Sequence, residues 1–257
     1  MSDFPATTIR SVRRGLVLPL LLLALWEISS HSGLVNRQFL PPLENVAATA
    51  WREFTNGELV YALATSLRRD LLGFLLGSGI GVLIGLLLGL SRIADRIATT
   101  WFNGLKQIAL LAWIPLISLW FGFDETAKVV FIALAAAIPV ILNLVEGVHA
   151  TSTKLVEVGE VFRFTSRQFV LFVYLPAAIP SLLTGLHLAL IYAWLATIGA
   201  EYFMAAGPGI GGLIISGRER FEMDLVMLGI IVVGTVGFTV DRGAAWLEQK
   251  LIPWQTA

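Results

Sequence analysis

The sequence predicts an all-α protein that crosses a membrane several times. Of its 257 residues, 56% are hydrophobic and only 14% are charged, and the mean hydropathy is +0.79. The apolar residues come in runs long enough to cross the hydrocarbon of a bilayer as helices. Six such runs predict six transmembrane helices, at residues 15–31, 67–90, 104–122, 127–148, 177–200 and 225–246.

The composition also excludes several classes of function. The chain has no cysteine, so it forms neither disulfides nor thiolate metal sites. Its three histidines are widely separated, and we predict no metal site and no catalytic cluster. The net charge is zero, which gives no basic field to attract nucleic acid. Because the pattern GxxxxGK[ST] does not occur, we predict that the chain binds neither ATP nor any other cofactor.

The first two elements follow from the N-terminal 55 residues. The first apolar run has the basic flank and short core of a signal peptide, but no clear small-x-small site follows it, so we expect an uncleaved first span. Glu27, near the end of this span, is expected at the membrane interface. Residues 43–55 place apolar side chains on one helical face, which predicts an amphipathic helix at the periplasmic membrane surface or against other helices. That face consists of Leu43, Val46, Ala47, Ala50, Trp51 and Phe54.

The second span carries a ridge of glycines at every fourth position. These are Gly73, Gly77, Gly81, Gly85 and Gly89. Glycine weakens a helix, but along one ridge in a bilayer it lets another helix approach closely. We therefore predict that this glycine ridge is a packing seam rather than a reflection of the general frequency of glycine in such helices.

The lysines and arginines predict how the chain is oriented. With the N-terminus in the cytoplasm, eleven of them fall on the inner side and seven on the outer side, so both termini are expected in the cytoplasm. The bias is moderate, because Arg68 and Arg69 fall at the outer end of the second span. On this topology residues 151–168 form a polar cytoplasmic loop.

Few polar side chains lie inside the predicted spans. His187 is well inside the fifth, and with Thr184, Trp194 and Thr197 it is a candidate for lining a translocation path. The alternative is a histidine that is hydrogen-bonded to a neighbouring helix. Glu146 and Glu201 lie near span ends, where a structural role at the interface is expected.

The segment Gly207 to Gly212, GPGIGG, matches the glycine pattern of dinucleotide-binding loops. It follows a spanning helix rather than a strand, so nucleotide binding is not predicted. We expect a tight turn here, followed by a short re-entrant helix at 210–217.

The loop between spans four and five reads EVGEVFRFTSRQFVLFVYLP from Glu157 to Pro176. It resembles the cytoplasmic EAA loop of the permeases of binding-protein-dependent ABC importers. In that pattern a glutamate begins the motif, a glycine follows six residues later, and a Leu-Pro pair lies about ten residues further on. Here Arg163 stands where the family usually has glycine.

The resemblance extends over nearly the whole chain and is greatest to permeases for aliphatic sulfonates, taurine and nitrate. It rests on the segments FLPPLENV, SLRRDLLGF, LAWIPLISLWFGFDETAK, LPAAIPSLLTGLHLAL, the pair AE at 200–201, and IPW at 252–254. Ala109 stands where many relatives have proline, so a weaker kink is expected there.

The resemblance implies a type I importer permease fold in the inner membrane. It further implies a homodimer with two ABC ATPase subunits, which bind ATP and Mg, and a periplasmic solute-binding protein. The loop at 151–168 would then form a coupling helix in a groove of the ATPase. Its coupling residues would be Glu157, Val158, Gly159, Glu160, Val161, Phe162 and Arg163.

Two further expectations concern this loop. Because a left-handed backbone is costly for a residue other than glycine, we expect Arg163 to stay right-handed. Pro176 is expected to mark the start of the fifth span.

The expected function is import of a small anion, most of all an aliphatic sulfonate, with taurine and nitrate as alternatives. A stand-alone channel or a membrane-embedded enzyme is the alternative from another class.

Overall fold

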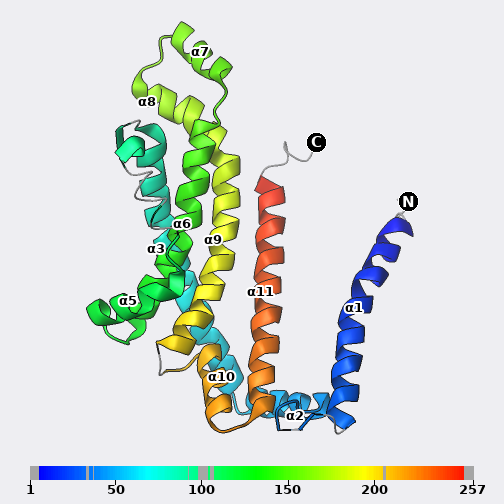
Figure 1. The fold of residues 1–257 in the computed structure, drawn as a ribbon. Helices are drawn as coiled ribbons and strands as arrows, with labels where there is room; N and C mark the ends of the chain where they lie inside the picture. Colours follow the sequence, from blue (N-terminus) through cyan, green and yellow to red (C-terminus); the bar gives the residue numbers. More distant parts are fainter. Residues whose placement is uncertain are drawn as a thin grey trace. The chain divides into compact units, whose positions relative to one another are not determined.

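The computed structural model describes residues 6–32, 35–36, 38–91, 93–97, 104, 107–204 and 207–251, and all regular structure among them is helical (Figure 1). The predicted all-α class is confirmed. The chain divides into two compact units: residues 1–60 with 213–231, and residues 61–212 with 232–257.

Within the part of the chain that the structure describes, four helices are long and apolar enough to cross a membrane, at Glu58–Leu90, Glu125–His149, Ser166–Phe203 and Met223–Lys250. Two shorter apolar helices, Val17–His31 and Leu110–Phe121, lie within the predicted first and third spans. Residues 105–106 of the predicted third span and the IPW segment at 252–254 lie outside the described residues. The number of six crossings stays a prediction.

The first unit begins with α1 (Ala6–His31) and α2 (Leu43–Thr55). The turn between them is held to α1 by side chains: Trp26 donates to the Pro41 carbonyl at 2.9 Å, and Ser30 donates to the Leu40 carbonyl at 2.9 Å. Glu27 accepts a hydrogen bond from the backbone N–H of Leu43 at 3.1 Å. A carboxylate at the start of a helix is favourable, so Glu27 has a definite structural role at the start of α2.

The helix α2 forms at the predicted position, but its buried face differs from the predicted apolar face. Val46, Thr49 and Glu53 are buried, whereas Trp51 is 70% exposed and Phe54 is also exposed. The hydroxyl of Thr49 donates to the carboxylate of Asp224, at the start of α11 (Met223–Leu251). The polar pair therefore anchors α2, and the exposed aromatic residues fit the membrane-surface alternative.

In the second unit, α3 (Glu58–Leu90) and α6 (Glu125–His149) pack along the glycine ridge. A Cβ added at the five glycines would press first against Ile132, Ala133, Val140, Leu144 and Val148 of α6, in that order. At Gly81 it would lie 2.9 Å from Val140 Cβ, whereas at Gly79, off the ridge, it would have no neighbour within 4 Å. The glycine ridge therefore faces α6, and it lets the backbones of the two helices approach closely.

The same contacts show that α3 and α6 run parallel, because positions increase together along both helices. The chain between them comprises residues 91–124, of which 91, 93–97, 104 and 107–124 are described. Its described helical parts are residues 93–97 and a short 3-10 helix, η1 (Leu110–Trp113), which is followed by α5 (Ile114–Phe121). The predicted third span thus contains a change of helix type.

The helix α3 begins at Glu58 rather than near residue 67, where the second span was predicted to start. Gly57, with φ +84°, makes the turn before it, and no proline interrupts the helix between Glu58 and Leu90. Arg69 and Asp70 are therefore inside the helix and not at its end, and both are buried.

Helix α9 (Leu175–Phe203) packs antiparallel to α6 through small residues. Their shared core includes Ala127, Ala135, Ala136, Ala189, Ala193, Ala196 and Ala200. At Gly185 an added Cβ would lie 2.9 Å from Asn143 Cβ, and at Gly147 it would lie 2.6 Å from Ser181 Cβ. Close packing of these two helices gives the second unit its core.

Pro176 lies in the first turn of α9, as expected, although the helical backbone does not start there. The helical backbone begins at Ser166 with α8 (Ser166–Phe169), passes through a π-helical turn, η2 (Val170–Tyr174), and continues as α9. Proline has no N–H to donate and its ring clashes with the preceding turn of an α-helix. The wider π turn directly before Pro176 lets the helix continue.

Candidate functional sites

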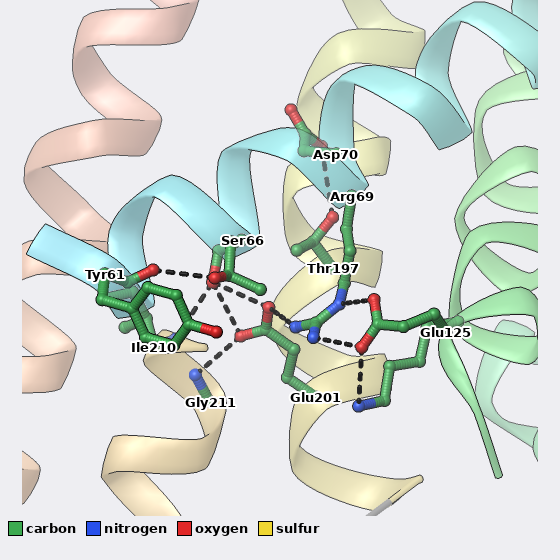
Figure 2. Close-up of polar contacts among 11 residues, drawn as sticks. Tyr61, Ser66, Arg69, Asp70, Glu125, Thr197, Glu201, Ile210 and Gly211 are labelled. Atoms are coloured by element: carbon green, nitrogen blue, oxygen red, sulfur yellow. Dashed lines mark hydrogen bonds and ion pairs between the residues drawn. The ribbon is translucent and has the colours of Figure 1, made fainter. Parts of the chain in front are cut away.

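A network of buried charges joins α3, α6 and α9 at the end of α6 where Glu125 lies (Figure 2). Its centre is the guanidinium of Arg69, whose side chain is 3% exposed. Arg69 Nη1 donates to Glu201 Oε1 at 2.6 Å, and its Nε and Nη2 both donate to the carboxylate of Glu125. Because a buried charge is costly unless it is paired, these contacts tie the three helices together.

The carboxylate of Glu201 is fully enclosed and accepts hydrogen bonds from several directions. Besides Arg69, Ser66 Oγ lies 2.7 and 2.9 Å from its two oxygens, and the Gly211 N–H donates to Oε2 at 2.9 Å. The Ile210 N–H donates to Ser66 Oγ at 3.0 Å. The start of α10 (Ile210–Glu219) therefore faces a carboxylate, which suits the positive end of a helix.

The predicted turn at GPGIGG packs against the carboxylate of Glu201 and donates a backbone hydrogen bond to it. Gly207 and Gly209 have φ values of +127° and +157°. A Cβ added at Gly209 would lie 2.5 Å from the carboxylate carbon of Glu201, so only glycine lets the backbone pass here. Glu201 was expected in a structural role at a span end, and the structure places it inside the network, bound to Arg69, Ser66 and Gly211.

The second carboxylate of the network is far more accessible. The Glu125 side chain is 59% exposed, although both cations that it approaches are buried. Lys128 Nζ lies 3.9 Å from Glu125 Oε1, and its side chain is 2% exposed. Glu125 thus reaches from the surface onto a buried Arg–Lys pair.

A cavity of about 660 Å³ opens beside the network. Its wall includes Arg68, Arg69 and Glu125, the hydroxyl-bearing Tyr61, Thr65 and Thr126, and the apolar Leu72, Leu76, Val129 and Val130. A second cavity of about 410 Å³ shares Leu76, Val129 and Val130 with the first and is otherwise lined by apolar side chains. The second unit therefore contains a cavity with charged groups in its wall and an apolar cavity that shares three wall residues with it.

The four residues predicted to line a path all make contacts between helices. His187 lies 3.0 Å from both Asp241 Oδ1 and Glu248 Oε2, and Thr184 donates to Glu248 Oε1 at 3.1 Å. These are contacts with α11, and they match the alternative in which the histidine is hydrogen-bonded to a neighbouring helix.

Trp194 also contacts α11, whereas Thr197 contacts α3. Trp194 Nε1 donates to the Val233 carbonyl at 3.1 Å, and Thr197 donates to Asp70 Oδ1 at 3.3 Å. The four predicted residues are therefore not gathered around one cavity, and their role in a path stays a prediction.

Sequence reasoning missed Arg69, Glu125 and Lys128 as one site. Each lies in a segment that supported the resemblance, SLRRD or DETAK, but the segments were interpreted separately. A possible signal was the presence of Arg69 and Lys128 near the outer ends of two apolar runs, because membrane helices carry such charges only where they are paired. Asp241 and Glu248, which contact His187, were missed for the same reason.

Three side chains of metal-ligand type meet in the first unit, although no metal site was predicted. His31 lies 3.2 Å from Glu27 and 3.5 Å from Glu44. Their ligand atoms all lie within 4.8 Å of one another, and the side chains are largely exposed. These distances are those of a surface histidine paired with two carboxylates.

At the opposite end of α6, the loop that resembles the EAA motif forms helix α7 (Thr153–Val161). Most of its apolar side chains are exposed: Val161 is 81% exposed, Phe162 is 71% exposed, and Leu155 and Val158 are exposed as well. Glu157 and Glu160 are exposed beside them. We call Leu155, Val158, Val161 and Phe162 the α7 patch.

The expectation that Arg163 stays right-handed is wrong, because its φ is +52°. Its N–H donates to the Glu160 carbonyl at 2.9 Å, and the next N–H, that of Phe164, donates to the Gly159 carbonyl at 2.9 Å. These two bonds make a Schellman motif, in which the residue after the helix is left-handed and usually glycine. Arg163 thus adopts the backbone conformation that the family's glycine would have.

Aromatic packing holds this unfavourable conformation in place. The ring of Phe164 lies 5.8 Å from that of Phe169 in a T-shaped arrangement and 6.3 Å from that of Phe172. A Cβ at Gly159 would lie 2.6 Å from Phe169, so the small residue lets the rings pack against α7. Internal packing therefore gives the loop a defined structure, although its α7 patch is exposed.

Comparisons with known proteins agree with this architecture. Residues 77–253 match the family described as "Binding-protein-dependent transport system inner membrane component". Two proteins that bear the name aliphatic sulfonates transport permease protein SsuC are similar. The one from Bacillus subtilis (strain 168) is 37% identical over 95% of this chain and 88% of its own length. The one from Escherichia coli (strain K12) is 38% identical over 93% of this chain and 91% of its own length.

A taurine transport system permease protein, TauC of Escherichia coli (strain K12), is 31% identical over 91% of this chain and 86% of its own. Among solved structures, that of an amino acid ABC transporter has the same fold, with a TM-score of 0.66 at 17% identity over 79% of this chain and 97% of the other. The predicted type I fold is thereby confirmed. The chain belongs to the family of binding-protein-dependent transport system inner membrane components and is a permease subunit of an ABC importer, which works with separate ATPase and binding-protein partners and is not itself an enzyme.

Proposed function

We propose that the chain forms the translocation path for a small organic anion, most of all an aliphatic sulfonate. The observation that carries this proposal is that two relatives named for aliphatic sulfonates are 37% and 38% identical to it over almost its whole length. Taurine and nitrate are the alternatives, and the taurine permease supports the first of them at 31% identity. Bicarbonate joins them, because a permease of Synechococcus elongatus named for it is 32% identical over 93% of this chain and 90% of its own length.

We further propose that two copies of the chain assemble in the bilayer, and that each binds an ABC ATPase subunit through its α7 patch. The exposed valines and phenylalanine of the patch support this, because a surface group of large apolar side chains indicates a protein contact. ATP and Mg would be held by the ATPase, and a solute-binding protein would dock on the other side of the membrane. The excess of basic residues on the α7 side supports a cytoplasmic location for both termini.

The path itself is proposed to run along the interface of the two copies and to involve α9. His187 and Trp194 stay candidates, although both also bind α11. Their replacement is expected to lower uptake more than it lowers the amount of permease in the membrane.

Uptake by the whole importer tests the proposed function. The permease, its ATPase and the binding protein encoded beside it would be reconstituted in liposomes, and uptake of radiolabelled ethanesulfonate would be measured with and without ATP inside. We expect ATP-dependent uptake that taurine, nitrate and bicarbonate inhibit weakly. Uptake without ATP would indicate a channel, and stronger uptake of another anion would replace the sulfonate assignment.

A further inference from the structure

The wall of the 660 Å³ cavity contains Arg69, whose two carboxylate partners differ in accessibility. Glu201 is enclosed and has hydrogen bonds from Ser66 and Gly211 in addition to Arg69. Glu125 is 59% exposed, and its described contacts are those with Arg69 and Lys128. Of the two carboxylates, Glu125 is therefore the one that can leave its cations without opening the helix bundle.

The groups that Glu125 covers are those of an anion site. Arg69 presents two donors to it in a fork, and Lys128 lies behind as a point charge. An arginine fork matches two oxygens of a carboxylate or of any oxyanion with similar spacing, and a buried cation binds its partner more strongly than an exposed one. The Glu125 carboxylate has the chemistry of a built-in ligand for this pair.

We propose that Arg69 and Lys128 bind the anionic headgroup of the transported solute, and that Glu125 occupies their site until the solute displaces it. The proposal rests on the proposed function and names the site for its solute. In the network Arg69 and Lys128 balance Glu125 and Glu201. When Glu125 swings out towards water, Arg69 Nε and Nη2 lose their acceptor, and the oxygens of a monoanion can take its place.

The cavity walls favour an anion with an alkyl tail. Beyond the charged end lie Leu72 and Leu76 of α3 and Val129 and Val130 of α6, and the shared residues lead into the apolar 410 Å³ cavity. Ligand sites of this size are mostly apolar with a few polar groups that fix orientation. A sulfonate has several oxygens and one negative charge for the cations, and its alkyl chain fits the apolar wall.

Binding to the intact permease–ATPase complex in lipid nanodiscs tests this site. The probe is radiolabelled ethanesulfonate, and the variants are Glu125→Gln, Lys128→Met and, as a matched control, Asp124→Asn. Asp124 is the adjacent carboxylate, whereas the described hydrogen bonds of Arg69 go to Glu125 and Glu201, so loss of Asp124 changes the net charge equally without freeing the site. Glu125→Asp is added as a variant that keeps the charge but shortens the side chain.

If Glu125 fills the site about nine-tenths of the time, Glu125→Gln should tighten ethanesulfonate binding about tenfold, because the apparent dissociation constant scales inversely with the competent fraction. Glu125→Asp should tighten it in the same direction, and Lys128→Met should weaken it. Asp124→Asn should stay within about twofold of the wild type. Diethyl sulfone, which is neutral, should not compete.

Unchanged or weaker binding in both Glu125 variants, with the melting temperature preserved, would overturn the proposal and leave the network as a purely structural clamp. If the wild-type importer still takes up ethanesulfonate in that case, the proposed function stands and only this site fails. If the Glu125 variants instead tighten binding of nitrate or bicarbonate and not of ethanesulfonate, the anion site stands and the sulfonate assignment fails.

Discussion

At the Glu125 end of α6, charged side chains are buried among three helices, whereas at the His149 end the α7 patch of apolar side chains is exposed. Both arrangements are costly if they are left as they are, because a buried charge needs a partner and a large apolar surface in water attracts one. At the first end the partners are in the same chain: Arg69 has Glu125 and Glu201. At the second end no described residue covers Val161 or Phe162.

The two ends thus differ in kind: one is stabilised by contacts within the chain, and the other presents a surface for a partner. The enclosed part of the ion network, Arg69 with Glu201, has its polar groups satisfied within the chain, so its integrity should decide whether the chain folds. The α7 loop is shaped by internal contacts of Phe164 and Phe169 but keeps its patch outward, so its surface should decide whether a partner binds. Substitutions at the two ends should therefore have different readouts.

The largest loss of stability is expected at Glu201. Glu201→Ala leaves Arg69 Nη1, Ser66 Oγ and the Gly211 N–H without their acceptor inside the helix bundle. Removing one partner of a buried ion pair costs about 3 kcal/mol or more in the free energy of unfolding. Thermal unfolding of the purified permease in detergent measures it, with Glu146→Ala at an exposed position of α6 as the control.

A loss of less than about 0.5 kcal/mol, as expected for the control, would show that the network is not what holds this end together.

The next largest effect is expected on the glycine ridge, which connects the two ends. Gly81→Leu would force a branched side chain against Val140, where even a Cβ would be only 2.9 Å away. Overpacking of this kind costs about 1 to 3 kcal/mol. Gly79→Leu is a matched control two residues away, because a Cβ there meets nothing within 4 Å.

Gly81→Leu should lower both the melting temperature and the amount of permease in the membrane, whereas Gly79→Leu should lower neither. Equal behaviour of the two variants would mean that the ridge does not set the packing of α3 on α6.

The smallest effect is expected in the α7 loop, at Arg163. A residue other than glycine costs about 1 to 2 kcal/mol in the left-handed conformation. Glycine avoids this cost but loses about 0.5 to 1 kcal/mol, because its unfolded chain has more conformational freedom. Arg163→Gly should therefore stabilise the loop by roughly 1 kcal/mol or less. Arg167→Gly, in the helical backbone of α8, should instead destabilise it by about 1 kcal/mol.

Amide hydrogen exchange at Phe164, whose N–H closes the Schellman motif, reports on this loop. Slower exchange is expected in Arg163→Gly and faster exchange in Arg167→Gly. Faster exchange in both would show that the arginine side chain itself holds the turn.

Local patterns were sufficient to predict part of this structure. The four-residue glycine period identified the ridge, and α2 and α7 lie within their predicted segments because each has its own turn residues at its ends. The partners of Arg69 were out of reach, because Glu201 lies 132 positions away in the sequence and Glu125 lies 56 away. Such pairs depend on helix order and register, which no single segment contains.

The rule that proline lies in the first turn of a helix held at Pro176, and the π turn before it lets the helical backbone run on from α8. A second local rule failed because the surroundings outweighed it. The rule against left-handed arginine failed at Arg163, where two capping hydrogen bonds and the packing of Phe164 together exceed its cost of about 1 to 2 kcal/mol.

The most direct test of the central claim is co-purification of the ATPase subunit with permease variants of α7. Glu157→Lys and Val161→Asp change exposed side chains, so neither should alter the amount of permease in the membrane or its melting temperature. If α7 is the docking element, Val161→Asp should abolish recovery of the ATPase, and Glu157→Lys should reduce it strongly, because a reversed charge at a partly desolvated contact repels the partner site. Wild-type recovery of the ATPase with both variants would contradict the account.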